Sequence, residues 1–232
     1  MSSIFNEKYV ETTYSSKKSS YPLKFCKHIK EKYKITSGSK LLDIGCGNGD
    51  ITKNFKDLGL QVHGIDISNS SKHLLSEHEF SKVNLNNAPY PLKSETFDFV
   101  FSKSVVEHMR DPDILIDESF RLLKKGGIFI CMTPSWKHSF KEAFYIDHTH
   151  VTPFTRYSLK TACELSGFEA KCEYFYQLPL LWKHKTAHLL RFLISSLPLP
   201  YHPFSDFFKN STINKTIRFS KEAMLLCTAI KK

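Results

Sequence analysis

The 232-residue sequence lacks several features that would mark a specialised class of protein. It has no apolar run of about 18 residues, the length of a membrane span, and its first 25 residues hold no apolar core of signal-peptide length. Its cysteines include no pair with the C-x-x-C spacing of a zinc or redox site. These absences exclude a membrane bundle and a small disulfide-stapled scaffold. We expect a reduced, cytoplasmic chain in which Cys131 packs in the core.

Acidic residues are scarce at both ends of the chain. Residues 1–40 carry nine lysines against three glutamates, and residues 171–232 carry ten basic side chains against three acidic ones. The formal net charge of +10 therefore belongs to the two ends. A basic patch can steer a protein toward phosphates, and it can equally be a solvated surface. Charge alone does not choose between nucleic-acid, lipid and small-molecule partners.

Strand-like and helix-like segments alternate from residue 41 onward. We expect strands at 41–44, 61–65, 81–85, 97–101, 128–132, 168–176 and 222–230. We expect helices at 50–58, 112–123, 158–166 and 185–197. Alternation of this kind predicts an α/β protein with a doubly wound parallel sheet.

A glycine-rich loop follows the first expected strand. The sequence LLDIGCGNGD places Gly45, Gly47 and Gly49 between a strand and a helix, where a ligand can approach the backbone closely. A dinucleotide fingerprint would need its third glycine at Asp50, and no Gly-Lys-Ser/Thr follows to complete a phosphate-binding loop. An acidic residue at the helix N-terminus also disfavours a pyrophosphate. The loop therefore favours a ligand other than NAD.

A carboxylate at the end of the second expected strand suggests what that ligand carries. Asp66 ends the sequence GID and follows the glycine loop. A carboxylate at this edge of a parallel sheet can accept both hydroxyls of a ribose. The alternative is an aspartate that caps the next helix. We favour a nucleoside site.

Four sequence blocks, in order over residues 41–134, carry a family resemblance. They are LLDIGCGNGD, GIDIS, NAPYPLKSETFDFVFSKSVVEHMRDP and ESFRLLKKGGIFICMTP. Together they resemble the class I S-adenosylmethionine-dependent methyltransferases. The resemblance implies a mostly parallel seven-stranded, Rossmann-like sheet with an antiparallel last strand, and S-adenosylmethionine as the cofactor. The cofactor domain would comprise 41–176 and 221–232, with a basic helical or lid segment at 1–40 and an insertion at 177–220.

The resemblance also implies which residues contact the cofactor. These are Asp43, Gly45, Cys46, Gly47, Gly49, Asp66, Ile67, Asn84, Leu85 and Ser102. In this assignment Asp43 lies near the ammonium group, Asp66 takes the ribose diol and Ser102 faces the sulfonium. Asn84 stands where the family usually has an aspartate that meets the adenine amino group, so we expect weaker base selectivity.

The chemistry needs a positioned acceptor, and a hydroxyl acceptor also needs a general base. The sequence YIDHTH, at 145–150, leaves three hypotheses open. His148 or His150 could be the base; Asp147 with both histidines could hold a divalent metal on a sugar diol; or the segment could be a polar loop that orders the next helix. His108 is a further candidate base, or it is structural together with Glu107. We predict no resident metal.

These observations lead to a functional prediction with alternatives. The leading one is methyl transfer to a small acceptor, a hydroxyl of a sugar or lipid-linked intermediate, because YIDHTHVTPFTRYSL resembles a block in family members that modify saccharides or lipids. RNA methylation fits the basic ends, but the sequence has no recognisable RNA-binding module or amino-methylating signature, so nucleic acid is not expected as a partner. A non-catalytic scaffold is the third alternative.

The insertion at 177–220 supports several roles. Residues 185–197 have an apolar helical face, flanked by Trp182 and by the basic residues Lys183 and Arg191. This face could pack on the domain, close over the substrate, form a homodimer contact or lie on the inner membrane surface. Tyr9, Tyr14 and Tyr21 could form a second part of a lid.

Overall fold

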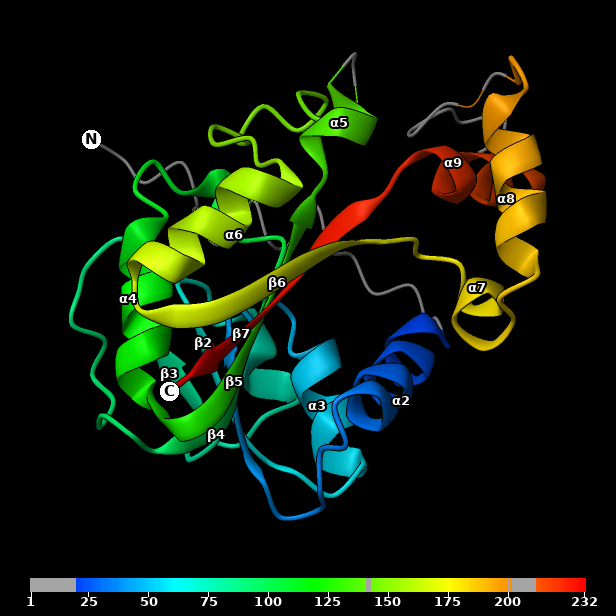
Figure 1. The fold of residues 1–232 in the computed structure, drawn as a ribbon. Helices are drawn as coiled ribbons and strands as arrows, with labels where there is room; N and C mark the ends of the chain where they lie inside the picture. Colours follow the sequence, from blue (N-terminus) through cyan, green and yellow to red (C-terminus); the bar gives the residue numbers. More distant parts are fainter. Residues whose placement is uncertain (1–19, 141–142, 200, 202–211) are drawn as a thin grey trace.

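The computed structural model describes residues 20–140, 143–199, 201 and 212–232 (Figure 1). Within these ranges, seven strands form one sheet in the order β3-β2-β1-β4-β5-β7-β6. The strands are β1 (Lys40–Ile44), β2 (Gln61–Asp66), β3 (Phe80–Lys82), β4 (Phe97–Lys103), β5 (Leu123–Pro134), β6 (Phe168–Phe175) and β7 (Met224–Lys231). β1 to β5 are mutually parallel, whereas β7 runs antiparallel to β5 and β6. The predicted topology, including the antiparallel last strand, is confirmed.

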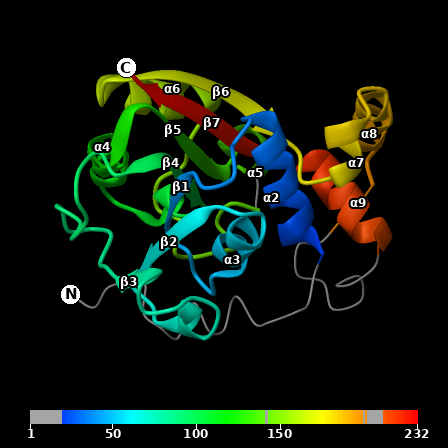
Figure 2. The same ribbon diagram turned by 90° about the horizontal axis from the view of Figure 1, so that it is seen from below.

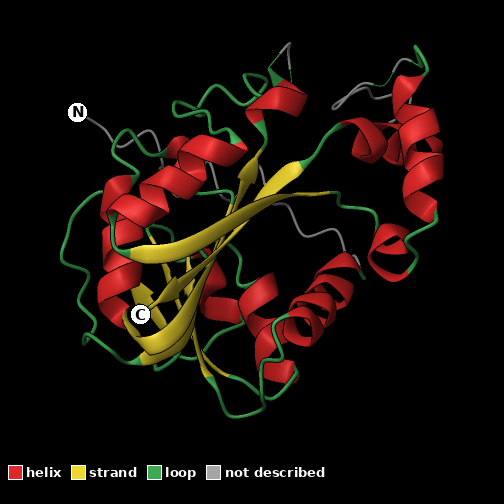
Figure 3. Cartoon of the chain, in the orientation of Figure 1, coloured by secondary structure: helices red, strands yellow, loops and turns green. Residues whose placement is uncertain are grey.

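Helices cover both faces of the sheet (Figures 1 and 3). α2 (Tyr21–Lys32) and α3 (Asp50–Asp57) lie on one face; α4 (Asp113–Leu122) and α6 (Arg156–Leu165) lie on the other. Successive residues of a strand point to opposite faces, so Val100 packs with the α4 side and Phe101 with Phe25 of α2. Both residues are fully buried, and Cys131 is buried as predicted. The sheet is therefore apolar on both sides.

The third strand is shorter than expected, which matters for the site. Residues 81–85 were predicted to be a strand, but β3 ends at Lys82. The carbonyl oxygen of the Asn84 side chain accepts from the backbone N–H of Asn86 at 3.1 Å, which turns the chain out of the sheet. Asn84 and Leu85 consequently lie on a loop beyond the strand.

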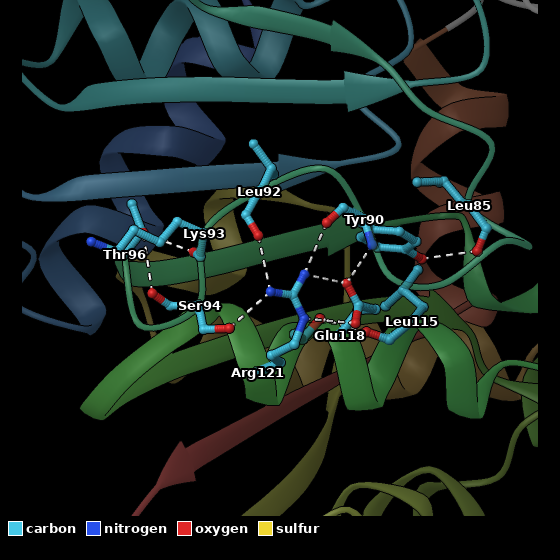
Figure 4. A network of polar contacts seen from close by, with 10 residues as sticks. Leu85, Tyr90, Leu92, Lys93, Ser94, Thr96, Leu115, Glu118 and Arg121 are labelled. Atoms are coloured by element: carbon cyan, nitrogen blue, oxygen red, sulfur yellow. Dashed lines mark hydrogen bonds and ion pairs between the residues drawn. The ribbon is translucent and has the colours of Figure 1, made fainter.

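An ion pair between a buried glutamate and a half-buried arginine anchors that loop (Figure 4). Arg121 and Glu118 of α4 are joined by two hydrogen bonds, of 2.8 and 2.6 Å. Arg121 also donates to the backbone oxygens of Tyr90 and Leu92, while Glu118 accepts from the N–H of Tyr90 at 2.7 Å. The Tyr90 hydroxyl then donates to the carbonyl oxygen of Leu85 at 2.9 Å. The Glu and Arg of the ESFRLLKKGG block thus hold the loop that carries Leu85.

Other boundaries differ from expectation for local reasons. β5 begins at Leu123 and continues through Gly126 and Gly127, where the sequence predicted only a stop; the β4–β5 register shifts between Phe97 and Phe99 to accommodate the extra residues. α6 begins at Arg156 because Thr155 and Ser158 form a reciprocal capping box. The 3₁₀ turns η1 (Ser70–His73) and η2 (Val106–His108) and the short α5 (Trp136–Ser139) were not predicted.

The residues after β6 form a separate group of helices. These are α7 (Pro179–Lys183), α8 (Ala187–Ser196) and α9 (Thr212–Lys221), which lie beside the sheet rather than over it (Figures 1 and 2). Tyr9 and Tyr14 of the predicted lid lie outside the described residues. In the described ranges, no helix is long and apolar enough to cross a membrane.

Candidate active site

The glycine loop turns sharply where β1 ends. The N–H groups of Gly45 and Cys46 both donate to the carbonyl oxygen of Ile65 in β2, at 2.8 and 3.2 Å. Gly45 has φ +77°, and a Cβ there would overlap Val105. Gly47 has φ +53°, and the space that its Cβ would fill is open. The loop therefore needs glycine for its conformation at both positions, and at Gly47 it leaves room beside the backbone.

Two buried carboxylates flank this loop and line the same cavity. Asp66 accepts from the N–H of Gly47 at 2.9 Å and from the N–H of Ser68 at 2.8 Å. Asp43 accepts from the Thr52 hydroxyl at 2.5 Å. Burial raises the pKa of Asp43 to about 7 and raises the pKa of Asp66. A cation that entered the cavity would stabilise both carboxylates in their charged form.

The cavity has a volume of about 280 Å³ and lies at the carboxyl ends of β1, β2 and β4. The predicted cofactor residues that line it are Asp43, Gly45, Cys46, Gly47, Asp66, Ile67, Asn84 and Leu85. Gly49 and Ser102 lie outside its described lining. Gly49 has φ +79° and precedes α3, and the Ser102 hydroxyl is turned back onto β1, where it donates to the carbonyl oxygen of Ile44 at 3.0 Å.

Several lining residues were missed by the sequence analysis. Lys103, the last residue of β4, and Ser104, which follows it, line the cavity, whereas Ser102 does not. Val105, Met109 and Tyr21 add apolar surface to its wall. The sequence analysis selected Ser102 from the sequence FSKS, whereas the next two residues of that sequence line the cavity. Tyr21 comes from α2; the sequence analysis named it as part of a possible lid but not as a residue that lines the cofactor cavity.

Two of the predicted histidines come together at the rim of this cavity. His108 lines it, and the ring centroids of His108 and His150 are 4.6 Å apart. The segment 147–152 is tied onto η2, because the N–H groups of Val151 and Thr152 both donate to the carbonyl oxygen of Glu107. His148 is exposed and outside the described lining. Of the three histidines, His108 thus lines the cavity, His150 packs against His108, and His148 is exposed.

Hydrogen bonds fix the tautomer of His108. The Thr149 hydroxyl donates to a carboxylate oxygen of Asp147 at 2.6 Å, so it accepts from Nδ1 of His108 at 2.8 Å. Nε2 is then the basic nitrogen of a neutral ring. Burial and the neighbouring His150 lower the pKa of His108, so the ring is neutral at pH 7. The arrangement is a chain from imidazole to hydroxyl to carboxylate.

A different trio replaces the metal hypothesis based on Asp147, His148 and His150. Ligand atoms of Glu107, His108 and His150 lie within 4.8 Å of one another. The Glu107 oxygen Oε2 accepts from Thr133, and Oε1 has no partner among the described residues. Burial raises the pKa of Glu107 to about 7. In its protonated form this carboxyl can stay buried without a metal.

Comparison with known proteins places this fold and cavity in a family. A family model described as "Methyltransferase domain" matches residues 20–173, which include β1 to β5, most of β6, the glycine loop and His108. The chain belongs to this family. The prediction of a class I S-adenosylmethionine-dependent methyltransferase, with that cofactor, is confirmed.

Individual methyltransferases match parts of the chain. A ubiquinone biosynthesis O-methyltransferase from Pelagibacter ubique is 36% identical over 112 residues, which are 45% of this chain and 46% of that protein. Phosphoethanolamine N-methyltransferase 2 from Caenorhabditis elegans is 32% identical over 109 residues, 44% of this chain and 25% of that protein. The chain therefore matches less than half the length of these curated relatives.

The fold has close counterparts among solved methyltransferases. An S-adenosylmethionine-dependent methyltransferase from Archaeoglobus fulgidus superimposes with a TM-score of 0.63, covering 97% of this chain and 98% of that one at 20% identity. At this identity the likeness concerns the fold alone.

Proposed function

We propose that this chain transfers the methyl group of S-adenosylmethionine to a hydroxyl oxygen of a small acceptor, with His108 as the general base. The observation that carries the proposal is the chain of hydrogen bonds from His108 through Thr149 to Asp147 at the rim of the cavity. The O-methyltransferase named above supports an oxygen acceptor.

The cavity fits the cofactor through its donor set and its shape. Asp66 would hold the ribose diol, Asp43 would face the ammonium group, and the open space at Gly47 would admit the methionine moiety along the backbone. When bound, S-adenosylmethionine supplies an electrophilic methyl group. The protein's contribution is then to orient the acceptor oxygen and take up its proton.

The environment of His108 limits the kind of hydroxyl it can activate. Because its pKa is lowered, neutral His108 is a weak base, best matched to an acidic hydroxyl such as a phenol or enol. Val105 and Met109 line the cavity beside it and offer apolar contact to the body of the acceptor. The prediction of a sugar or lipid-linked hydroxyl finds no support in the relatives' names, and we propose an apolar molecule with an acidic hydroxyl instead.

The first test pairs two histidine variants. His108→Gln should lower kcat about 100-fold or more with a panel of phenols and enols, while the affinity for S-adenosylmethionine changes little, because the base acts on the acceptor. His148→Gln is the matched control and should leave both quantities unchanged, because His148 is exposed. Formation of S-adenosylhomocysteine gives the rate, and calorimetry gives the affinity.

Other outcomes would point elsewhere. Equal loss of rate in both variants, or none in His108→Gln, would contradict the role of His108. Loss of rate on chelation, restored by a divalent cation, would favour a metal held by Glu107, His108 and His150. Binding of S-adenosylmethionine without turnover on phenols, amines or RNA would favour the scaffold alternative.

A further inference from the structure

A second cavity lies away from the methyl-transfer site. It has a volume of about 490 Å³ and is enclosed by α5, by α8 and by the end of α9. It shares no described lining residue with the first cavity. Four of the side chains that line it carry or can carry positive charge: Lys137, His138, Arg191 and Lys221. Its described lining contains no aspartate or glutamate.

Arg191 is the best-placed donor in this cavity. Its guanidinium lies 4.1 Å from the centroid of the Tyr176 ring, and one of its terminal nitrogens donates to the carbonyl oxygen of Ser220 at 3.3 Å. Its Nε is buried and has no hydrogen-bond partner in the described part of the chain. Planar guanidinium groups with an uncommitted N–H edge are well suited to oxyanions.

Ser220 adds a second unsatisfied group to the same cavity. The residue is almost fully buried, and its hydroxyl has no hydrogen-bond partner among the described residues. Buried polar atoms are seldom left unpaired, because the loss of water is then uncompensated. Two such groups on facing elements, α8 and α9, indicate that the cavity is built to receive a ligand that accepts hydrogen bonds.

The charged side chains around the cavity indicate that the ligand is an anion. Burial, and then the positive charges of Lys137 and Arg191, lower the pKa of His138 on α5, and all three residues line the cavity. Lys221 donates to the carbonyl oxygens of Leu197 and Leu199 and so ties α9 to the chain that leaves α8. Arg218 of α9 is paired with Glu222, whereas Arg191 has no ion pair with a described carboxylate. The described lining therefore carries positive and no negative side chains.

We propose that this cationic cavity, formed around Lys137, His138, Arg191, Ser220 and Lys221, binds a phosphate-type oxyanion. The proposal is independent of the acceptor suggested above. Such an anion has two sources, a soluble phosphate and the headgroup of an anionic lipid. α8 makes the second source worth testing, because its polar side chains face the cavity while Leu189 and Leu193 on the opposite side are 67% and 54% exposed.

Binding to the full-length chain provides the test. Inorganic phosphate and pyrophosphate are titrated at low salt by calorimetry, and co-sedimentation is measured with vesicles of phosphatidylcholine, with and without phosphatidylglycerol. Arg191→Gln should weaken anion binding at least tenfold, and Ser220→Ala should weaken it by a smaller factor. Lys183→Gln is the matched control, since it removes one exposed charge of α7 outside the cavity. Unchanged affinity for S-adenosylmethionine shows that each variant is folded.

The outcomes separate the two sources. Binding of the soluble anions that Arg191→Gln weakens supports a soluble phosphate ligand. Binding only to vesicles with phosphatidylglycerol, again weakened by Arg191→Gln, supports a lipid headgroup. Binding in neither arm, or equal losses in Arg191→Gln and Lys183→Gln, overturns the proposal.

Discussion

The two halves of the candidate active site are held together by contacts between residues at different separations along the sequence. On the cofactor side, Asp43 meets Thr52 nine residues along the chain, and Gly47 meets Asp66 at a separation of 19. On the acceptor side, His108 meets Thr149 at a separation of 41, and Thr152 meets Met109 at 43. The cofactor half is thus a local strand–loop–strand structure, whereas the acceptor half requires a later segment to fold back onto η2.

This difference implies that the two halves can be damaged separately. Changes in the cofactor half, here called the local half, should alter cofactor affinity. Changes in the acceptor half, here called the tethered half because segment 147–152 is bound to η2, should alter turnover while the cofactor still binds. The four predictions below test this separation, beginning with the largest expected effect.

Asp66→Ala should weaken S-adenosylmethionine binding about 100-fold or more, roughly 3 kcal/mol. The carboxylate is the proposed partner of the ribose diol, and it also holds the N–H groups of Gly47 and Ser68. Calorimetry measures the change. Asp57→Ala is the control, because Asp57 is an exposed acid on α3 that pairs only at the surface with Lys53. Near-native affinity in Asp66→Ala would show that the cofactor is held elsewhere.

Arg121→Ala tests whether the cofactor half also depends on a residue that is distant from it in the sequence. Removing the guanidinium leaves Glu118 buried beside Tyr90 and releases the loop that carries Leu85. We expect a loss of about 2 kcal/mol in the free energy of unfolding and a smaller loss of S-adenosylmethionine affinity.

Urea unfolding measures the first quantity and calorimetry the second. Lys160→Ala, which breaks an exposed pair with Glu164, is the control and should cost about 0.5 kcal/mol or less. If Arg121→Ala were as mild as that control, the network in Figure 4 would not be what holds the loop.

The same difference in range explains what the sequence could and could not predict. The glycine loop and Asp66 follow from motifs whose residues are near one another in the chain, and the resemblance carried by these motifs implied the mostly parallel sheet. The fourth strand was expected to end at residue 101, but β4 continues to Lys103. Ser102 therefore lies within the strand, where the pleat points its side chain away from the cavity that Lys103 lines. His148 and His150 could not be separated, because only the contact of segment 147–152 with η2 turns one inward and leaves the other exposed.

Thr149→Val tests the hydrogen-bond chain of the tethered half. The substitution keeps the shape of the buried side chain but removes the hydroxyl between His108 and Asp147. We expect kcat to fall about tenfold with unchanged S-adenosylmethionine affinity, and Thr149→Ser to restore most of the rate. The acid limb of the pH–rate profile should also move to lower pH, because the hydroxyl accepts from Nδ1 of His108 and so favours its protonated form. A simple packing role would leave the profile in place and give no rescue by serine.

The smallest effect concerns the pH dependence of cofactor binding. Burial and the nearby Asp66 raise the pKa of Asp43 to about 7, against the opposing hydrogen bond from Thr52. Below that pH the carboxyl carries a proton, which it must release to face the ammonium group of S-adenosylmethionine. Affinity should therefore be flat above pH 7 and weaken up to about tenfold per unit below it, or about tenfold between pH 8 and pH 6. In Asp43→Asn the affinity should be lower and nearly independent of pH over this interval. A wild-type profile that stayed flat to pH 5 would mean that Asp43 remains charged without the cofactor, and the ammonium group would then need another partner in the local half of the site.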